Sequence, residues 1–193
     1  RMMTSRTEYR LLHRQDNADE RFAAVGRALG LVSEERFQAV EEKYAAVAAE
    51  ARRLETAGVS PSPALDALLA EKGEPPAPNG ARLADLLRRP RISYADLSPF
   101  DPQRPALDDE VKGQVEITVK YQGYIDRQLR QVEEMRRLES RPLPHDLDYS
   151  SLTGLRLEAR EKLSRIRPLN LGQASRISGV SPADIAVLMV ALE

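Results

Sequence analysis

The chain has 193 residues, of which 41% are hydrophobic, and this length and composition permit one large or two small domains with a real core. Its 29 basic and 30 acidic residues give a net charge of −1. The absence of cysteine excludes a thiol nucleophile, a thiolate metal site and a disulfide scaffold, and two distant histidines, His13 and His145, predict no metal site. No run approaches 18 uncharged apolar residues and no leader precedes the first helix, so we expect no membrane span, no signal peptide and a cytoplasmic location.

The first predicted element is a helix that begins at Ser5. Ser5 and Glu8 have the spacing of a capping box, in which each side chain satisfies a free backbone donor of the first turn. Arg6, Arg10 and Arg14 follow at four-residue spacing, so on a helix they would form a basic ridge. Such a ridge suits phosphate oxygens, although a solvated surface explains it equally well.

Helical periodicity continues through the next hundred residues. Apolar residues spaced by three and four predict a helix that ends at Gly30, a long amphipathic helix from Ser33 to Gly58, and short helices around Leu65 and Leu83. Stretches rich in proline predict a loop at 73–80 and a second break at 98–105. We interpret the second break as a boundary, which gives a first helical subdomain (1–97), a proline-rich linker (98–108) and a C-terminal helical subdomain (109–193).

Residues 115–121 are ambiguous, because apolar and β-branched residues alternate there as in a half-buried strand. A longer window favours one helix over 109–139, since five apolar residues then share one side: Val111, Val115, Ile125, Leu129 and Val132. The opposite side carries basic residues and two glycines that would let a partner approach the backbone: Lys120, Arg127, Arg130, Gly113 and Gly123. Acidic residues interrupt this side, so ordinary ion pairing with solvent exposure is the alternative to a binding role.

The C-terminal segment predicts three helices. The first is closed by Pro168, the second runs over 171–177, and the third starts at Pro182 after the N-cap Ser181. The turn at Gly179 makes the last two resemble a helix-turn-helix. The sequence therefore predicts an all-α, multi-helix fold with a small C-terminal helical bundle that contains a helix-turn-helix-like pair.

The last predicted helix does not suit DNA. It offers Asp184 and no lysine or arginine to base edges, so we expect no sequence-specific DNA binding. Ile185 and Leu188 on this helix are candidates for contact with a protein partner. Arg165 and Arg176 on the preceding helices could approach a nucleic-acid backbone without reading its sequence.

Three segments in this order carry a family resemblance: residues 1–12 with 16–19, residues 120–125 (Lys-Tyr-Gln-Gly-Tyr-Ile) and residues 166–180. They are similar to the C-terminal region of glucose-inhibited division protein A (GidA), the family of FAD-dependent tRNA uridine 5-carboxymethylaminomethyl modification enzymes. The resemblance implies a full-length protein with an N-terminal FAD domain, which acts as a homodimer with a partner GTPase on the wobble uridine of tRNA. This chain would be its helical tail, with no catalytic, cofactor-binding or metal-binding residue, and would not be active alone.

The resemblance also suggests what this tail does. It implies docking of tRNA and of the partner, and no Gly-x-Gly-x-x-Gly fingerprint for a dinucleotide occurs in the chain. The candidate RNA contacts are Arg6, Arg10, Arg14, Lys120, Arg127, Arg130, Arg165 and Arg176. The alternative is a pure protein-interaction module that docks the GTPase, through Ile185 and Leu188, without direct RNA contact.

Overall fold

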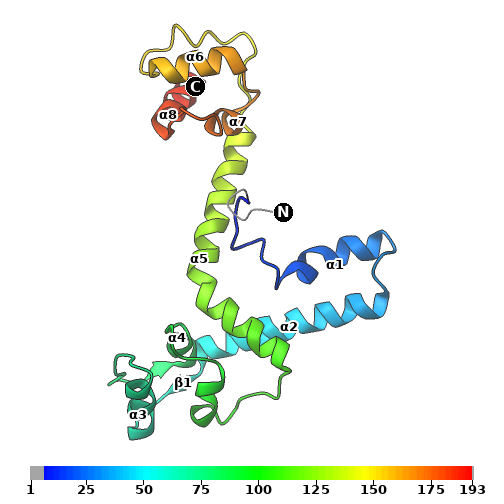
Figure 1. Ribbon diagram of the computed structural model, residues 1–193, viewed down its shortest axis with the longest axis vertical. Helices are drawn as coiled ribbons and strands as arrows, with labels where there is room; N and C mark the ends of the chain where they lie inside the picture. Colours follow the sequence, from blue (N-terminus) through cyan, green and yellow to red (C-terminus); the bar gives the residue numbers. More distant parts are fainter. Residues whose placement is uncertain (1–6, 193) are drawn as a thin grey trace. The chain divides into compact units, whose positions relative to one another are not determined.

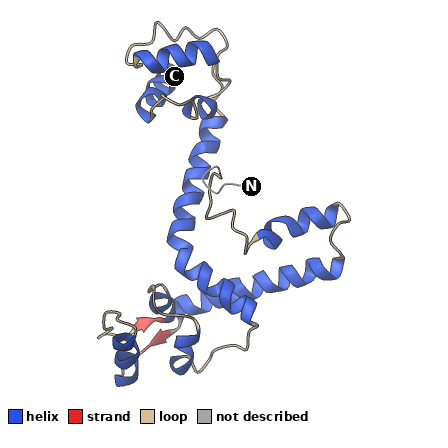
Figure 2. Cartoon of the chain, viewed as in Figure 1, coloured by secondary structure: helices blue, strands red, loops and turns tan. Residues whose placement is uncertain are grey.

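The protein is built almost entirely of helices in the computed structural model, which describes residues 7–192 (Figures 1 and 2). The predicted all-α class is confirmed, with the addition of one small antiparallel pair of strands. The chain divides into two compact units, of which unit 1 extends to Asp126 and unit 2 begins at Arg127. None of the helices within residues 7–192 is long and apolar enough to cross a membrane.

Unit 1 opens with a helical hairpin of α1 (Ala18–Ala28) and α2 (Glu34–Thr56). The turn between them passes through Gly30, whose φ of +71° is a conformation that favours glycine. As predicted, α2 is capped by Ser33, whose side chain accepts a hydrogen bond from the Arg36 N–H at 3.3 Å. The local sequence therefore determines where this hairpin turns and where its second helix begins.

The apolar side of α1 is largely exposed. Phe22, Val25 and Leu29 recur at helical spacing as predicted, but their side chains are 59%, 56% and 68% exposed. The buried residue of α1 is instead the small Ala23, and Gly26 lies against Val32 in the turn that leads to α2. The periodicity predicted the helix correctly, but the largest apolar side chains do not face the core of unit 1.

After α2 the chain forms a small subdomain of β1 (Gly58–Val59), α3 (Pro63–Glu71), β2 (Ala81–Arg82) and α4 (Leu83–Leu87). β1 and β2 pair antiparallel, with Gly58 opposite Arg82 (Figure 2). Strands of two residues are too short to leave a sequence pattern, which explains why they were not predicted. Leucines dominate the core here: Leu54, Leu65, Leu69, Leu83, Leu86 and Leu87.

The proline-rich segment belongs to unit 1 rather than forming a linker. The 3-10 helix η2 (Ala95–Phe100) buries Leu97, and Phe100 and Leu107 pack against the same core. The predicted boundary at 98–108 therefore differs from the observed division after Asp126. Proline stops a regular helix because it removes a backbone donor, but it does not prevent neighbouring side chains from packing.

Helix α5 (Asp109–Glu139) is continuous over 31 residues, which confirms the helical interpretation of the ambiguous segment (Figure 1). Val111, Val115 and Val119 follow at four-residue spacing and are buried in the core of unit 1. Val115 and Val119 belong to the alternation that resembled a strand. The last part of α5, from Arg127, belongs to unit 2.

Unit 2 continues with α6 (Leu157–Ile166), α7 (Leu171–Ser175) and α8 (Pro182–Ala191). The predicted turn at Gly179 is present with a φ of +96°. Within α6, Ala159 and Leu163 are buried, whereas Leu157 and Ile166 are 69% and 49% exposed. The fully buried Tyr149 lies among aliphatic side chains: Leu143, Leu155, Leu163, Leu171, Ile185 and Leu188.

Candidate nucleic-acid interface

Residues 7–17 form turns, so the predicted helix over this segment is wrong. Tyr9 has a φ of +54°, outside the right-handed helical region. Arg14 donates through Nη1 to the Leu11 carbonyl at 2.6 Å, and Asn17 donates through Nδ2 to the Leu12 carbonyl at 3.1 Å. These side chains occupy carbonyls that a continuing helix would use for its own backbone bonds.

The predicted basic ridge is consequently not formed in the part of it that the structure describes. Arg14 also donates through Nε to both carboxylate oxygens of Asp16 at 3.1 Å, and its side chain is 19% exposed. Arg10 is exposed. Ser5 and Arg6 lie outside the described residues. Of the three predicted arginines, Arg10 alone has a described side chain that is exposed.

The Asp16-Asn17-Ala18-Asp19 motif anchors the N-terminal segment of unit 1. Gln114 of α5 donates through Nε2 to the Asp16 carbonyl at 3.1 Å. Asp19 accepts a hydrogen bond from the Tyr44 hydroxyl at 2.8 Å and pairs with Lys43, both on α2. Burial opposes ionisation, but the hydrogen bonds from Lys43 and Tyr44 hold the pKa of Asp19 below its ordinary value. The motif thus has a structural role that sequence reasoning missed.

On α5 the candidate Lys120 is held within unit 1. Its amine bonds Glu116 at 2.8 Å and lies 3.5 Å from the Pro90 carbonyl, and its side chain is 20% exposed. Two exposed aromatic residues follow it, Tyr121 and Tyr124. Both belong to the Lys-Tyr-Gln-Gly-Tyr-Ile motif of residues 120–125, and the sequence predicts no role for either of them.

The remaining basic candidates lie in unit 2 and have exposed side chains: Arg127, Arg130, Arg165 and Arg176. Arg176 pairs with Glu139 at 2.6 Å. Unit 2 carries 11 lysines and arginines against 9 acidic residues, whereas unit 1 carries 18 against 21. Unit 2 therefore has a net charge of +2 (11 minus 9) and unit 1 a net charge of −3 (18 minus 21), a difference that the net charge of the whole chain conceals.

A polar cluster fixes the helix-turn-helix-like pair. Asp184 accepts hydrogen bonds from Arg156 Nη2 at 2.7 Å and from the Ser181 backbone at 2.8 Å, and Arg156 Nη2 also donates to the Gly179 carbonyl at 2.9 Å. Lys162 donates to the Ser178 carbonyl at 2.6 Å. A side chain at Gly179 would collide with Glu158 and Lys162. Asp184 is thus buried as a structural group and is not presented to a ligand.

The two predicted partner-binding residues lie in the core. Ile185 is 7% exposed and Leu188 is fully buried. Neither side chain is available as a surface contact. A large apolar residue that is exposed on α8 is Val190, at 73%. It lines a shallow groove together with Leu152, Ala186 and Val187.

The described residues do not fit a flavin or a metal ion. Among residues 7–192 no group of three or more histidine, aspartate or glutamate side chains could hold a metal. Within residues 7–192 the sheet consists of β1 and β2, two antiparallel strands of two residues each. It lacks the parallel strands and the glycine-rich turn that bind the pyrophosphate of a dinucleotide. A hollow beside α1 is lined by Asp16, Asp19 and Glu110, and these carboxylates would repel the negative charge of a pyrophosphate. We therefore assign no cofactor chemistry to these residues.

The fold defines a class: an all-α region of two compact units. Two family models match the chain. The model described as the tRNA modifying enzyme MnmG/GidA C-terminal helical domain covers residues 34–129, and the model of the MnmG/GidA C-terminal helical bundle covers residues 131–193. The chain belongs to this family and corresponds to its C-terminal helical region.

Relatives and solved structures agree with this assignment. The chain is 49% identical over 193 residues to the tRNA uridine 5-carboxymethylaminomethyl modification enzyme MnmG of Caldicellulosiruptor saccharolyticus and 47% identical to that of Bacillus cereus. Each match covers all of this chain and 31% of the relative, so the chain spans about a third of their length. GidA of Aquifex aeolicus, in its form I crystal, is similar with a TM-score of 0.64 and 35% identity, over 100% of this chain and 29% of that one.

The boundary between the two family models falls within α5, close to the observed division between the units. Residues 1–33 lie before the first model. They nevertheless contain the Asp16–Asp19 anchor, and the relatives match across the full 193 residues.

Proposed function

We propose that this chain is the tRNA-docking region of an enzyme that installs a carboxymethylaminomethyl group on the wobble uridine of tRNA. The observation that carries the proposal is the match over the whole chain to relatives named for that modification. For the complete protein we further propose FAD as cofactor, a partner GTPase, a homodimer and a cytoplasmic location. None of these rests on a residue of this chain.

The surface supports a docking role rather than a catalytic one. The exposed candidates are arginines, whose guanidinium groups suit phosphate oxygens and remain charged at any physiological pH. They are concentrated in unit 2, where basic residues exceed acidic ones. We propose Arg127, Arg130, Arg165 and Arg176 as backbone contacts, together with Arg10 in unit 1. Arg14 and Lys120 have side chains that are only 19% and 20% exposed and are weaker candidates.

The test is filter binding of a tRNA transcript to the full-length protein across a salt series. Replacing both Arg127 and Arg130 by Gln should raise the Kd and lower the slope of log K against log salt by about 0.7 to 0.9 for each phosphate that the protein no longer neutralises. Arg52→Gln is the matched control, because Arg52 is an exposed arginine on α2 outside the candidate set. Equal binding by the double variant and the control would overturn these contacts.

A second candidate function is docking of the partner GTPase without RNA contact, and the exposed groove at Val190 favours it. Val190→Asp in the full-length protein should then abolish co-precipitation of the GTPase and leave tRNA affinity unchanged, because an acidic group in an apolar contact is not solvated. Pro182→Ala, at the exposed start of α8, is the control. Unchanged co-precipitation by the Val190 variant would remove this groove as the docking site.

A further inference from the structure

One side of α1 carries an apolar stripe that the described residues leave largely uncovered. It consists of Ala18, Phe22, Val25 and Leu29, whose spacings of four, three and four residues bring them to one side of a helix. The three large side chains are each more than half exposed, and Leu31, which follows the helix, is 80% exposed. The charged residues of α1 lie outside these four positions. The stripe is therefore apolar along the length of α1.

The stripe has a fixed position within unit 1. Asp19, in the first turn of α1, binds Lys43 and the Tyr44 hydroxyl of α2, which anchors the helix at its beginning (Figure 1). The Arg21 guanidinium lies 4.8 Å from the centre of the Phe22 ring and orients it. Because this arrangement exists before any contact is made, docking of the surface costs little conformational entropy. Scattered exposed apolar residues are ordinary, whereas a gathered set marks a contact surface.

The stripe is too small to hold a separate molecule by itself. Helix α1 has 11 residues, so it is about 16 Å long and, with its side chains, about 10 Å wide. Each partner in a stable complex of separate chains buries about 800 Å², several times the area of such a strip. A contact this small becomes stable when a covalent connection supplies an effective concentration on the order of millimolar. The size of the stripe therefore favours an occupant in the same polypeptide over a second copy of the chain.

The relatives contain a polypeptide segment that could be this occupant. The chain matches 31% of the relative from Caldicellulosiruptor saccharolyticus, and the family models describe the matched region as C-terminal, so most of the relative precedes it. The 17 residues before Ala18 span at most about 60 Å even when fully extended. In a protein of the relatives' length, the preceding part of the chain is therefore tethered close to the stripe.

We infer that in the full-length protein the stripe docks on an apolar surface of the polypeptide that precedes this region. Phe22, Val25 and Leu29 lose their exposure in that contact, and α1 fixes unit 1 to the preceding part of the chain. The inference goes beyond the proposed function and does not depend on it, because it rests on exposed side chains and on family membership rather than on RNA binding.

Photo-cross-linking in the full-length protein tests the contact directly. Benzoyl-phenylalanine replaces Val25 in one variant and Ala24 in the control, because Ala24 is exposed on α1 but lies outside the stripe. After irradiation, the Val25 variant should keep the mass of a single chain on a denaturing gel, and mass spectrometry should place its cross-link on a peptide that precedes this region. The Ala24 variant should give much less of that product.

Hydrogen exchange gives a second measurement on the full-length protein. Val25→Glu should raise the exchange rate of the α1 amides by at least about tenfold, because a carboxylate in an apolar contact is not solvated and the contact is lost. Ala24→Glu, the control, should change it little. The new carboxylate lies one turn from Arg21 in the Val25 variant and one turn from Glu20 in the control, so ion pairing along the helix favours the Val25 variant and does not explain its faster exchange.

The cross-linking outcomes each decide the inference. A product of twice the chain's mass would show that a second copy covers the stripe and would overturn it. A product confined to residues of this region, a product with an added tRNA or partner GTPase, or a yield no higher than that of the Ala24 control would overturn it as well. If Val25→Glu leaves the protein unfolded, the cross-linking result decides alone, since benzoyl-phenylalanine is itself apolar. A protein that binds no tRNA but forms the expected cross-link would refute the proposed function and leave this inference in place.

Discussion

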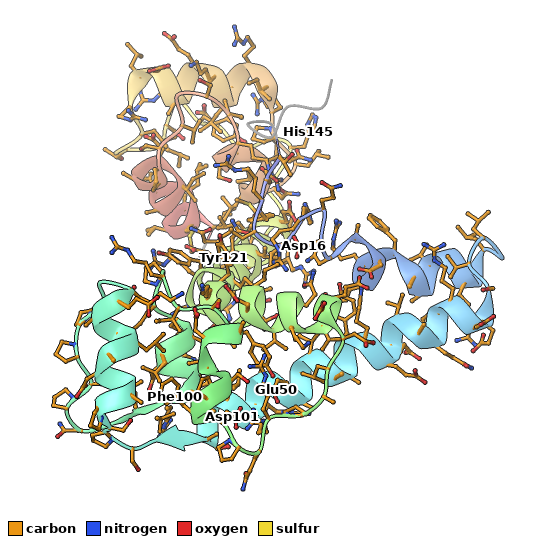
Figure 3. The ribbon with its side chains drawn as sticks, turned by 60° about the horizontal axis from the view of Figure 1, so that its bottom comes forward. Asp16, Glu50, Phe100, Asp101, Tyr121 and His145 are labelled. Carbon is orange, nitrogen blue, oxygen red and sulfur yellow. The ribbon has the colours of Figure 1, made fainter. Side chains whose placement is uncertain are left out.

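Replacing Arg53 by Met should lower the free energy of unfolding by about 3–5 kcal/mol. Arg53 donates through Nε and Nη2 to the Glu50 carboxylate at 2.7 and 2.8 Å and through Nη1 to Asp101 at 3.0 Å. The two carboxylates have side chains only 2% and 5% exposed (Figure 3 labels both residues). Without the guanidinium, two negative charges would remain buried without a cation between them. Such uncompensated buried charges lower the stability of the fold strongly.

The measurement is urea unfolding, followed by hydrogen exchange at the amides of α2 and η2. Arg88→Met is the control, since Arg88 pairs with Glu55 and Asp85, whose side chains are 42% and 55% exposed, and should change stability by less than about 1 kcal/mol. Adding Glu50→Gln and Asp101→Asn to the Arg53 variant should recover part of the loss, because the buried charges are then removed. An Arg53 variant as stable as the Arg88 control would contradict this account.

Asp184→Ala should destabilise unit 2 by about 2–4 kcal/mol. The carboxylate, whose side chain is 1% exposed, accepts from the Arg156 backbone at 3.2 Å at the start of α6 and caps α8 through Ser181. One group therefore satisfies free donors at the beginnings of two helices. Its removal leaves those donors without partners and frees Arg156.

The loss of stability caused by Asp184→Ala should also depend on pH. Hydrogen bonds from Arg156 hold the pKa of Asp184 below its ordinary value, although burial opposes them. A lowered pKa in the folded state means that the ionised carboxylate stabilises the fold above its ordinary pKa of about 3.9, and that this contribution is lost as the pH falls below that value.

Unfolding of the parent chain and of Asp184→Ala by urea, at about pH 6 and about pH 3, measures both effects, and the variant should show the smaller loss on acidification. Asp148→Ala is the control, because Asp148 also accepts two bonds, from Ser150 at 2.9 and 2.5 Å, but is exposed. Equal destabilisation by the two alanine variants would show that burial of Asp184 contributes nothing.

Much of the fold could be predicted because its signals are local. The Ser33 cap, the break at 73–80, the bounds of α5 and the start of α8 at Pro182 each depend on residues within one or two turns. Extending the window beyond residues 115–121 was enough to distinguish helix from strand, since the helical pattern persists for far longer than a strand would.

The errors arose where distant residues decide the structure. Ser5 and Glu8 have capping spacing, but the segment before α1 is held by tertiary hydrogen bonds at Asp16, whose carbonyl accepts from Tyr44 of α2 and from Gln114 of α5. The break at 98–108 contains prolines, but it also contains Phe100 and Leu107, which pack on the core. Periodicity shows which side of a helix is apolar and does not show what that side faces.

The candidate site was predictable in part for the same reason. The residue types, arginine and lysine, follow from the chemistry of phosphate, but the folded structure decides which of them are already bonded. Arg14 and Lys120 hold partners, whereas Arg127 and Arg165 are exposed. Ile185 and Leu188 could not be distinguished from surface residues, because α8 is apolar on most of its circumference and the sequence does not show which part is covered.

Because Tyr94 and Tyr149 are buried, the ultraviolet absorbance of each can report the unfolding of the unit that contains it. Tyr94 is 3% exposed in the core of unit 1, Tyr149 is 1% exposed in the core of unit 2, and the chain contains no tryptophan to mask them. Burial, together with the hydrogen bond to Glu50, raises the pKa of Tyr94 to about 12, and burial raises that of Tyr149. Ultraviolet difference spectra of Tyr→Phe variants at these positions thus assign an absorbance change to one unit or the other without any attached label.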